Sequence, residues 1–236
     1  MKKTIIALLA LAGAAFGAEY TTETVWTANF GSAYTGGYTT TLTTSTSGTF
    51  WDAADIAVEG GAQTRANKRI HMEGGTYGDW NTNFEFAITL TLTGDSITAG
   101  HIAEIKSGST SDWLCLGVNA NGALTLTGNE ISAATGTGSL ALDTQYTLTF
   151  AKIGTELTLS AGNASVTATL GSANAYTGII NNIALGGNTG SDKRVPVLVE
   201  SISWSNATPA PVVPEPATAT LSLLALAGLA ARRRRR

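Results

Sequence analysis

The middle of this chain is predicted to fold as an all-β domain, an antiparallel β-sandwich, and three features of the sequence point to it. Large apolar residues alternate with threonine and other small residues in many short runs, which is typical of strands with one buried and one wet face. Glycine and asparagine turns separate these runs at regular spacing. No run of about 12 or more residues in this region has the periodicity of a helix.

The alternation gives an ordered set of expected strands. Turn signals at Asn119–Gly122, Ile153–Gly154 and Ala161–Asn163 separate neighbouring members of this set. Only Ala53–Glu59 is compatible with a single helical turn. The first and last strands are expected to pair in one sheet. The expected strands are Thr24–Asn29, Tyr38–Thr43, Ile70–Glu73, Phe84–Leu92, Ile102–Lys106, Trp113–Val118, Ala123–Thr127, Tyr146–Phe150, Leu157–Ser160, Val166–Leu170, Ile183–Gly187 and Val197–Trp204.

The order of strands and turns over about residues 84–204 resembles that of laminin-G-like, concanavalin A-like jelly rolls. An Asn121–Gly122 hairpin, a Tyr146–Thr149 strand and an Ile183–Gly186 segment before the closing strand carry the resemblance. The resemblance implies a jelly-roll sandwich, in some members one calcium ion near the rim, and in others glycoside hydrolase activity. The pattern of strands also places four tryptophans in the expected core, namely Trp26, Trp51, Trp113 and Trp204.

The N-terminus has the three parts of a secretory signal. Lys2 and Lys3 precede an apolar run from Ile5 to Ala15, and Ala15-Phe16-Gly17 places small residues where a signal peptidase inspects the chain. We therefore expect residues 1–17 to form a signal helix that signal peptidase removes before Ala18. The alternative is a buried N-terminal helix, but no polar face repeats at helical spacing.

The C-terminal tail is predicted to be a sorting signal. A Pro-rich linker, 208–213, precedes Pro214-Glu215-Pro216, an uncharged segment at 217–231 and five arginines. As a helix the segment would span roughly 22 Å, which is short for a bilayer core of about 30 Å, and its arginines should stay cytoplasmic. A plain C-terminal anchor is the alternative.

This tail, residues 214–236, resembles the PEP-CTERM sorting signal of Gram-negative bacteria. The resemblance implies that a membrane-embedded exosortase recognises Pro214, Glu215 and Pro216. It also implies a precursor held in the inner membrane by helix 217–231, and later transfer of domain 18–207 to the cell surface or an extracellular matrix.

Charge and cysteine content restrict the partners. Between Ala18 and Val213 the chain has seven basic and sixteen acidic residues, a formal charge near −9. Such a domain repels phosphate backbones, so we expect no nucleic-acid partner. Cys115 is the single cysteine, so no intramolecular disulfide forms, and its apolar surroundings in the sequence indicate a small buried side chain.

Catalysis is not expected. A retaining glycoside hydrolase needs two carboxylates about 5–5.5 Å apart, yet Glu85 and Glu200 stand alone in their expected strands, and Asp52 and Asp55 fall on opposite faces. No Gly-x-Ser-x-Gly elbow occurs. A hydrolase remains an alternative to the binding function.

Metal binding is predicted only for calcium, and no other cofactor is expected. His71 and His101 are far apart in the sequence and have no cysteine near them, so zinc is not expected. Four oxygen-bearing loop residues could instead hold calcium, or could simply be solvated. These residues are Asp95, Asp112, Asn119 and Asp192.

Glycan binding is predicted from aromatic residues that lie among glycines. Tyr34 and Tyr38 flank Gly36-Gly37, and Tyr77 and Trp80 lie in a second glycine-rich stretch. Such aromatics could stack on sugars or could pack loops over the sandwich edge. The sequence thus favours a non-catalytic module for glycan or matrix binding, with a structural component of an extracellular layer or biofilm matrix as the alternative.

Overall fold

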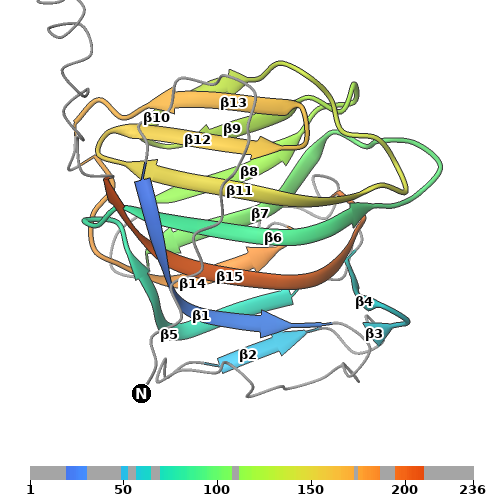
Figure 1. The fold of residues 1–236 in the computed structure, drawn as a ribbon, viewed down its shortest axis with the longest axis horizontal. Helices are drawn as coiled ribbons and strands as arrows, with labels where there is room; N and C mark the ends of the chain where they lie inside the picture. The colour runs from blue at the N-terminus through green and yellow to red at the C-terminus, as the bar shows by residue number, and fades with distance from the viewer. Residues whose placement is uncertain are drawn as a thin grey trace, which may run out of the picture.

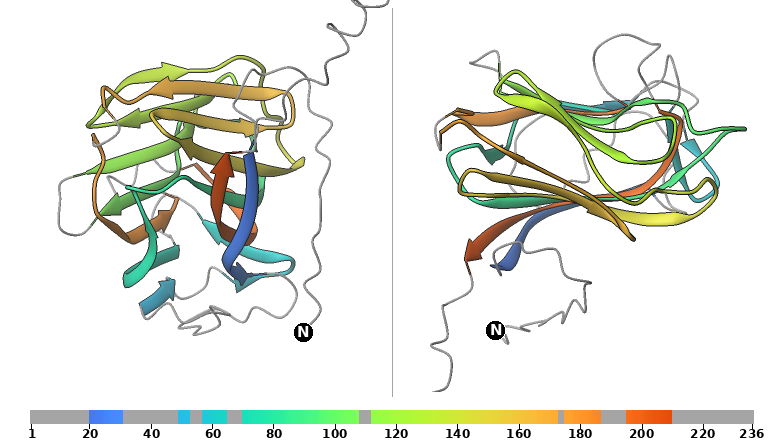
Figure 2. Two further views of the ribbon diagram at one scale, coloured as in Figure 1. Left: turned by 60° about the vertical axis from the view of Figure 1, so that its left-hand side comes forward. Right: turned by 90° about the horizontal axis from the view of Figure 1, so that it is seen from above.

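The domain is a sandwich of two antiparallel β-sheets, called sheet A and sheet B (Figure 1). The computed structural model describes residues 20–30, 49–52, 57–64, 70–107, 112–172, 175–186 and 195–209. All regular elements within these ranges are strands. The two layers are seen edge-on in the view from above in Figure 2.

Sheet A has eight strands. Its long strand β15 pairs with β6 on one side, and on the other side with β4 along 197–199 and with β1 along 201–209. In spatial order sheet A contains β13 (Ala164–Thr169), β12 (Glu156–Ala161), β11 (Gln145–Ile153), β6 (Phe84–Leu92), β15 (Val197–Pro209), β4 (Gly61–Thr64) and β3 (Ala57–Val58), with β1 (Tyr20–Asn29) beside β15.

Sheet B has seven strands and lies behind sheet A in Figure 1. Its central strands β7 and β14 pair with each other, and β8 pairs with the other side of β7. In spatial order sheet B contains β10 (Ile131–Thr135), β9 (Leu124–Gly128), β8 (Trp113–Val118), β7 (Gly100–Ser107), β14 (Ile179–Leu185), β5 (Ile70–Asp79) and β2 (Thr49–Asp52).

The core between the sheets is rich in aromatic rings. Trp204 stacks on Phe84 with ring centroids 4.2 Å apart and lies parallel to Trp26 at 6.3 Å. Trp80 stacks on Tyr176 at 4.7 Å. All five side chains are 0–1% exposed, and burying a large apolar side chain contributes about 1.5–3 kcal/mol. Trp26, Phe84 and Trp204 belong to strands of sheet A, whereas Trp80 directly follows β5 and Tyr176 precedes β14 of sheet B, so the rings join sheet A to the ends of two strands of sheet B.

Alternation along the strands explains which side chains reach this core. In β6, residues 84, 86, 88, 90 and 92 are buried while the residues between them are half-buried on the outside. The expected strands Phe84–Leu92 and Trp113–Val118 match β6 and β8 residue for residue. The expected pairing of the two ends of the domain is also confirmed, because Thr27 lies opposite Ser203 in the β1–β15 pair.

Some predictions of secondary structure were wrong, and others concern residues that the structure does not describe. The short strands β2, β3, β4 and β10 were not expected, and residues 57–58 form a strand rather than part of a helical turn. The expected strand 38–43, the signal helix 1–17 and the membrane helix 217–231 lie outside the described residues. The antiparallel sandwich is confirmed, whereas the jelly-roll connectivity stays a prediction.

No helix among the described residues is long and apolar enough to cross a bilayer.

Candidate functional site on sheet B

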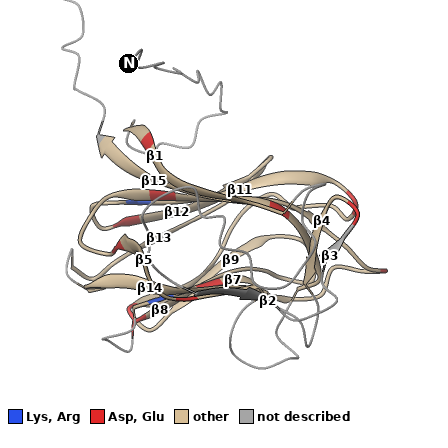
Figure 3. Ribbon diagram, turned by 90° about the horizontal axis from the view of Figure 1, so that it is seen from below, with Lys and Arg blue, Asp and Glu red and all other residues tan. Residues whose placement is uncertain are grey.

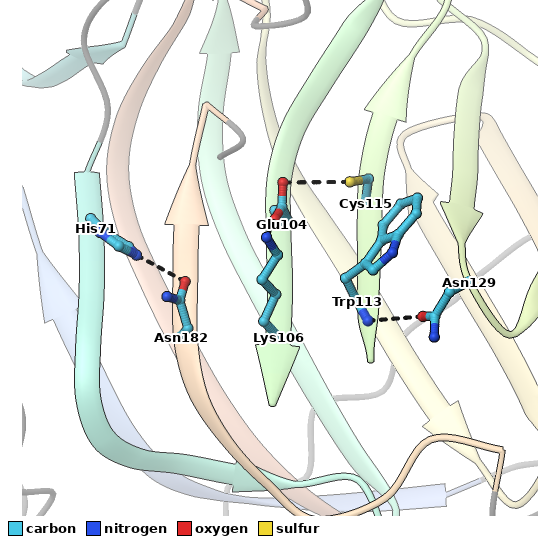
Figure 4. A network of polar contacts seen from close by, with 7 residues as sticks. All are labelled: His71, Glu104, Lys106, Trp113, Cys115, Asn129 and Asn182. Carbon is cyan, nitrogen blue, oxygen red and sulfur yellow. Dashed lines mark hydrogen bonds and ion pairs between the residues drawn. The ribbon is translucent and has the colours of Figure 1, made fainter. Parts of the chain in front are cut away.

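A cluster of polar, ionisable and aromatic side chains lies on the outer face of sheet B, meaning the side that points away from the core. Leu114 and Leu116 of β8 face the core, so the alternation of the strand turns Trp113 and Cys115 outward. On β7, Glu104 and Lys106 share this outer face, and each lies opposite a residue of β8. Figure 4 shows these side chains together.

One row of this face combines an amide, an ammonium group and an indole. Asn182 of β14 pairs with Lys106 of β7, which pairs with Trp113 of β8. All three side chains are partly exposed. Trp113 is therefore not the core residue that the sequence predicted, and its indole forms part of the surface. The side chain of Trp51 lies outside the described residues, whereas Trp26 and Trp204 are buried as expected.

The backbone of Trp113 is held on both sides. Its N–H donates to Asn129 Oδ1 at 2.9 Å, and its carbonyl accepts from the hydroxyl of Tyr176 at 3.0 Å. Next to it, the carboxylate of Asp112 accepts from the backbone N–H of Thr177 at 3.2 Å. These bonds from two segments, at Asn129 and at Tyr176–Thr177, fix the position from which the indole projects.

A second row, adjacent to the first, is buried although it lies on the outer face. It runs from Ala184 through Glu104 and Cys115, which are all 0–1% exposed, to the half-buried Thr127. Lys106 Nζ contacts Glu104 Oε1 as an ion pair. The Cys115 thiol donates to Glu104 Oε2 across 3.8 Å.

Cys115 is not poised as a nucleophile. Burial, followed by the negative charge of Glu104, raises the pKa of the thiol to about 12. Because the thiolate is the reactive form, a thiol that stays protonated at neutral pH is inert toward substrates. The expectation of a buried, structural cysteine is consistent with its 1% exposure.

His71 joins the first row from strand β5. Its Nε2 lies 2.9 Å from Asn182 Oδ1, and its Nδ1 lies 3.9 Å from Glu73 Oε2. Figure 4 shows the imidazole pointing toward Asn182 along the sheet. The network of polar side chains thus extends over β5, β14, β7 and β8.

A shallow groove of about 370 Å³ lies at the β10 end of the sheet and borders the second row at Thr127, so the second row separates it from Trp113. Its polar lining comes from His101, Asn119 and three threonines, Thr125, Thr127 and Thr135, and alanines make up much of the remainder. Gly117 lies between His101 and Thr125 in the pairing. A Cβ at this position would lie 2.5 Å from the Gly100 carbonyl oxygen and 2.7 Å from Thr125 Oγ1, so the close approach of these groups requires glycine here.

Two of the four aromatic residues in the predicted glycan platform are buried. Tyr77 and Trp80 are 1% and 0% exposed, and they pack in the core rather than in a surface loop. Tyr77 belongs to β5, and its ring meets Trp26 edge-on at 6.1 Å. Tyr34 and Tyr38 lie outside the described residues.

Two of the four predicted calcium residues, Asp112 and Asn119, do not converge. Asp112 and Asn119 lie at opposite ends of β8, roughly 20 Å apart for a strand of that length. Asn119 Oδ1 accepts the N–H groups of Asn121 and Ala123 at 2.9 and 3.0 Å, which closes the β8–β9 turn. Asp95 lies in the loop between β6 and β7, and Asp192 lies outside the described residues.

Charges are sparse over the described strands, and Lys106 and Lys152 are the only basic residues there (Figure 3).

Comparison with known proteins gives a clear result for the tail. Residues 212–236 match the family model described as the PEP-CTERM protein-sorting motif. The chain carries a PEP-CTERM sorting motif. This motif is associated with exosortase processing and marks the protein as exported and directed to the surface. The predicted residues Pro214, Glu215 and Pro216 lie within the match.

Solved structures resemble the sandwich in fold. Trypanosoma rangeli sialidase, in its covalent intermediate with 2,3-difluorosialic acid, superposes with a TM-score of 0.57 at 15% identity, covering 77% of this chain and 30% of the sialidase. At that identity the likeness shows the fold alone, and this chain spans less than a third of the sialidase.

Two further structures superpose less well. Domain 4 of AbnA, a GH43 extracellular arabinanase from Geobacillus stearothermophilus in complex with arabinotriose, gives a TM-score of 0.45 at 14% identity and 78% and 84% coverage of the two chains. Carbohydrate binding module CBM66 from Bacillus subtilis gives 0.42 at 12% identity and 72% and 96% coverage. No curated protein matches the sequence.

Proposed function

We propose that this exported protein is a non-catalytic surface module that binds glycan through the outer face of sheet B. The observation that carries the proposal is the row in which Trp113, Lys106 and Asn182 lie side by side, each partly exposed. An indole face stacks on the apolar side of a sugar ring, while amide and ammonium groups bond to its hydroxyls. The groove, which lies beyond the second row, offers further hydroxyl and amide groups to a chain of sugars.

The chemistry of the groove favours binding over hydrolysis. Its described lining contains hydroxyl, amide and imidazole groups and no carboxylate. Glu104 is paired with Lys106, and Glu73 lies on β5, with β14 between their two strands. Two strand spacings place their backbones about 10 Å apart or more, and a glycosidase needs both carboxylates directed at one bond.

A glycan-array screen of the purified chain tests this proposal. Wild-type protein is expected to bind a defined subset of glycans, and Trp113→Ala should weaken binding about tenfold or more, as for other aromatic anchors. Trp113→Phe should retain part of the affinity, and Thr147→Ala on the outer face of sheet A should retain all of it. Folded protein that binds no glycan, or that releases sugars from them, would contradict the proposal.

A structural role in an extracellular layer is the second candidate, and the outer face of sheet A favours it. Thr89 lies opposite both Thr147 and Ser201, and Thr149 lies opposite Ser160. Such cross-strand hydroxyl rows present a uniform polar coat suited to side-by-side packing of copies. Concentration-dependent self-association that Thr147→Lys abolishes would support this role, whereas a monomer at every concentration would argue against it.

A further inference from the structure

We propose that His101, Glu104 and Cys115 form a binding site for a divalent transition-metal ion of the zinc type. Their ligand atoms, an imidazole nitrogen, a carboxylate oxygen and the sulfur, all lie within 4.8 Å of one another. The set combines the three donor types that zinc takes in proteins. The sequence did not suggest it, because His101 and Cys115 are distant along the chain.

The fold brings the trio together by strand pairing. Glu104 of β7 lies directly opposite Cys115 of β8, and the thiol and Oε2 are 3.8 Å apart. A zinc ion lies about 2.3 Å from sulfur and about 2.0 Å from oxygen or nitrogen, so its ligands lie roughly 3.2–3.8 Å from one another. The sulfur and oxygen atoms therefore already have the separation that a tetrahedral ion requires.

An irregularity in β7 supplies the third ligand. Residues three apart on a regular strand point to opposite faces, so His101 would face away from Glu104. The pairing register shifts between His101 and Ala103, however, and this bulge turns the imidazole to the same face. Bulges that re-aim a side chain are frequent beside functional sites. The three ligand atoms lie within 4.8 Å of one another, so the half-buried imidazole would move by about 1 Å toward the other two ligands when a tetrahedral ion binds.

Neighbouring groups complete the arrangement. Lys106 contacts Glu104 Oε1, which leaves Oε2 directed toward the thiol as the single metal-binding oxygen. Metal-bound carboxylates generally have such an outer partner. Thiolate and carboxylate together neutralise a divalent ion, and the thiol proton passes to the solvent when the metal binds.

Three protein ligands leave the fourth position of a tetrahedral ion to water or to another ligand. Because His101 also lines the groove, this position lies on the groove side of the trio. The metal site shares Lys106 with the Trp113 row and adjoins the groove. Its test uses no glycan and therefore does not depend on glycan binding.

Cobalt is a spectroscopic substitute for zinc, so the test is a titration of the tag-free, reduced full chain with Co²⁺. We expect a sulfur-to-cobalt charge-transfer band together with the visible bands of four-coordinate cobalt, both removed by equimolar Zn²⁺. Cys115→Ser should abolish the charge-transfer band. His101→Gln should weaken Co²⁺ binding by about tenfold or more, because even outer partners are worth 10–100-fold.

His71→Gln is the matched control, since it removes the other histidine of the same face and should leave the titration unchanged. Thermal unfolding of each variant establishes that it is folded. If a variant does not fold, the Co²⁺ titration of the wild-type protein still decides whether the metal site exists. The proposal is overturned if wild-type protein shows no charge-transfer band, or if Cys115→Ser gives the same spectrum as wild type. It is also overturned if His71→Gln weakens binding as much as His101→Gln.

Discussion

Replacing Gly78 with alanine should loosen the contact that joins the two sheets. Gly78 lies in β5 of sheet B, and a Cβ there would overlap the indole of Trp204 from sheet A, 2.7 Å from its Cη2 atom. The indole cannot retreat, because Phe84 stacks on it at 4.2 Å and Trp26 lies parallel to it at 6.3 Å. Gly78 is therefore required by close approach rather than by its own backbone conformation.

The magnitude follows from the cost of overpacking a core. An extra methyl group in a full site costs about 1–3 kcal/mol, from which the reduced entropy of the unfolded chain returns about 0.4–1 kcal/mol. For a domain of this size each kcal/mol lowers Tm by about 2–4 °C. We expect Gly78→Ala to lower the urea midpoint and to lower Tm by several degrees at unchanged m-value.

Gly171→Ala provides the matched control, because a Cβ there has no atom within 4 Å. It should be neutral or slightly stabilising. Equal stability of Gly78→Ala and Gly171→Ala would refute the packing of β5 against Trp204.

Three further predictions concern the core and the thiol. Trp80→Ala should destabilise the domain by about 3–5 kcal/mol, measured by urea unfolding, because its ring is fully buried between Phe84 and Tyr176; a loss below about 1 kcal/mol would place it at the surface. Stability should fall as the pH rises from about 9 toward 12, since burial raises the pKa of Cys115 from 9.0 and that of Tyr77 from 10.0 to about 12, so that the unfolded chain loses these protons first. Burial lowers the pKa of Lys152, which makes stability rise with pH up to about pH 10.5, so the overall decrease in stability should be clearest above that pH. Tyr77→Phe should make the decrease smaller. A stability that does not change with pH in this range would contradict the burial of these groups. Finally, Cys115 should resist iodoacetamide at pH 8 in the native protein and react readily in urea, as followed by mass spectrometry, whereas rapid native labelling would contradict its burial beside Glu104.

Much of the sandwich could be predicted because its long strands alternate cleanly. Phe84–Leu92 places a large apolar residue at every second position, and this pattern fixes both its ends and its buried face. Gly61–Thr64 and Ile131–Thr135 have no such pattern, since small and polar residues fill both of their faces. Their strand conformation depends on pairing with neighbours, which a local pattern does not reveal.

The candidate site was harder to predict than the fold. Glycines around Tyr77 suggested an exposed loop, but Gly78 is needed because the Trp204 ring lies against it. Trp113 begins an apolar run that suggested a core position, yet strand alternation from Leu114 turns its ring outward. The pairing of the expected strands 102–106 and 113–118 as a hairpin could have placed Glu104 opposite Cys115. The register shift that adds His101 has no signal in the sequence.

The most direct test of glycan binding by sheet B is amide chemical-shift mapping of the isotope-labelled protein with the glycan that binds best. The proposed function predicts that the largest shifts fall on β7, β8 and β9, around Lys106, Trp113 and Thr125, and that they vanish in Trp113→Ala. Shifts confined to β6, β11 and β12 of sheet A, or no shifts at saturating glycan, would contradict it.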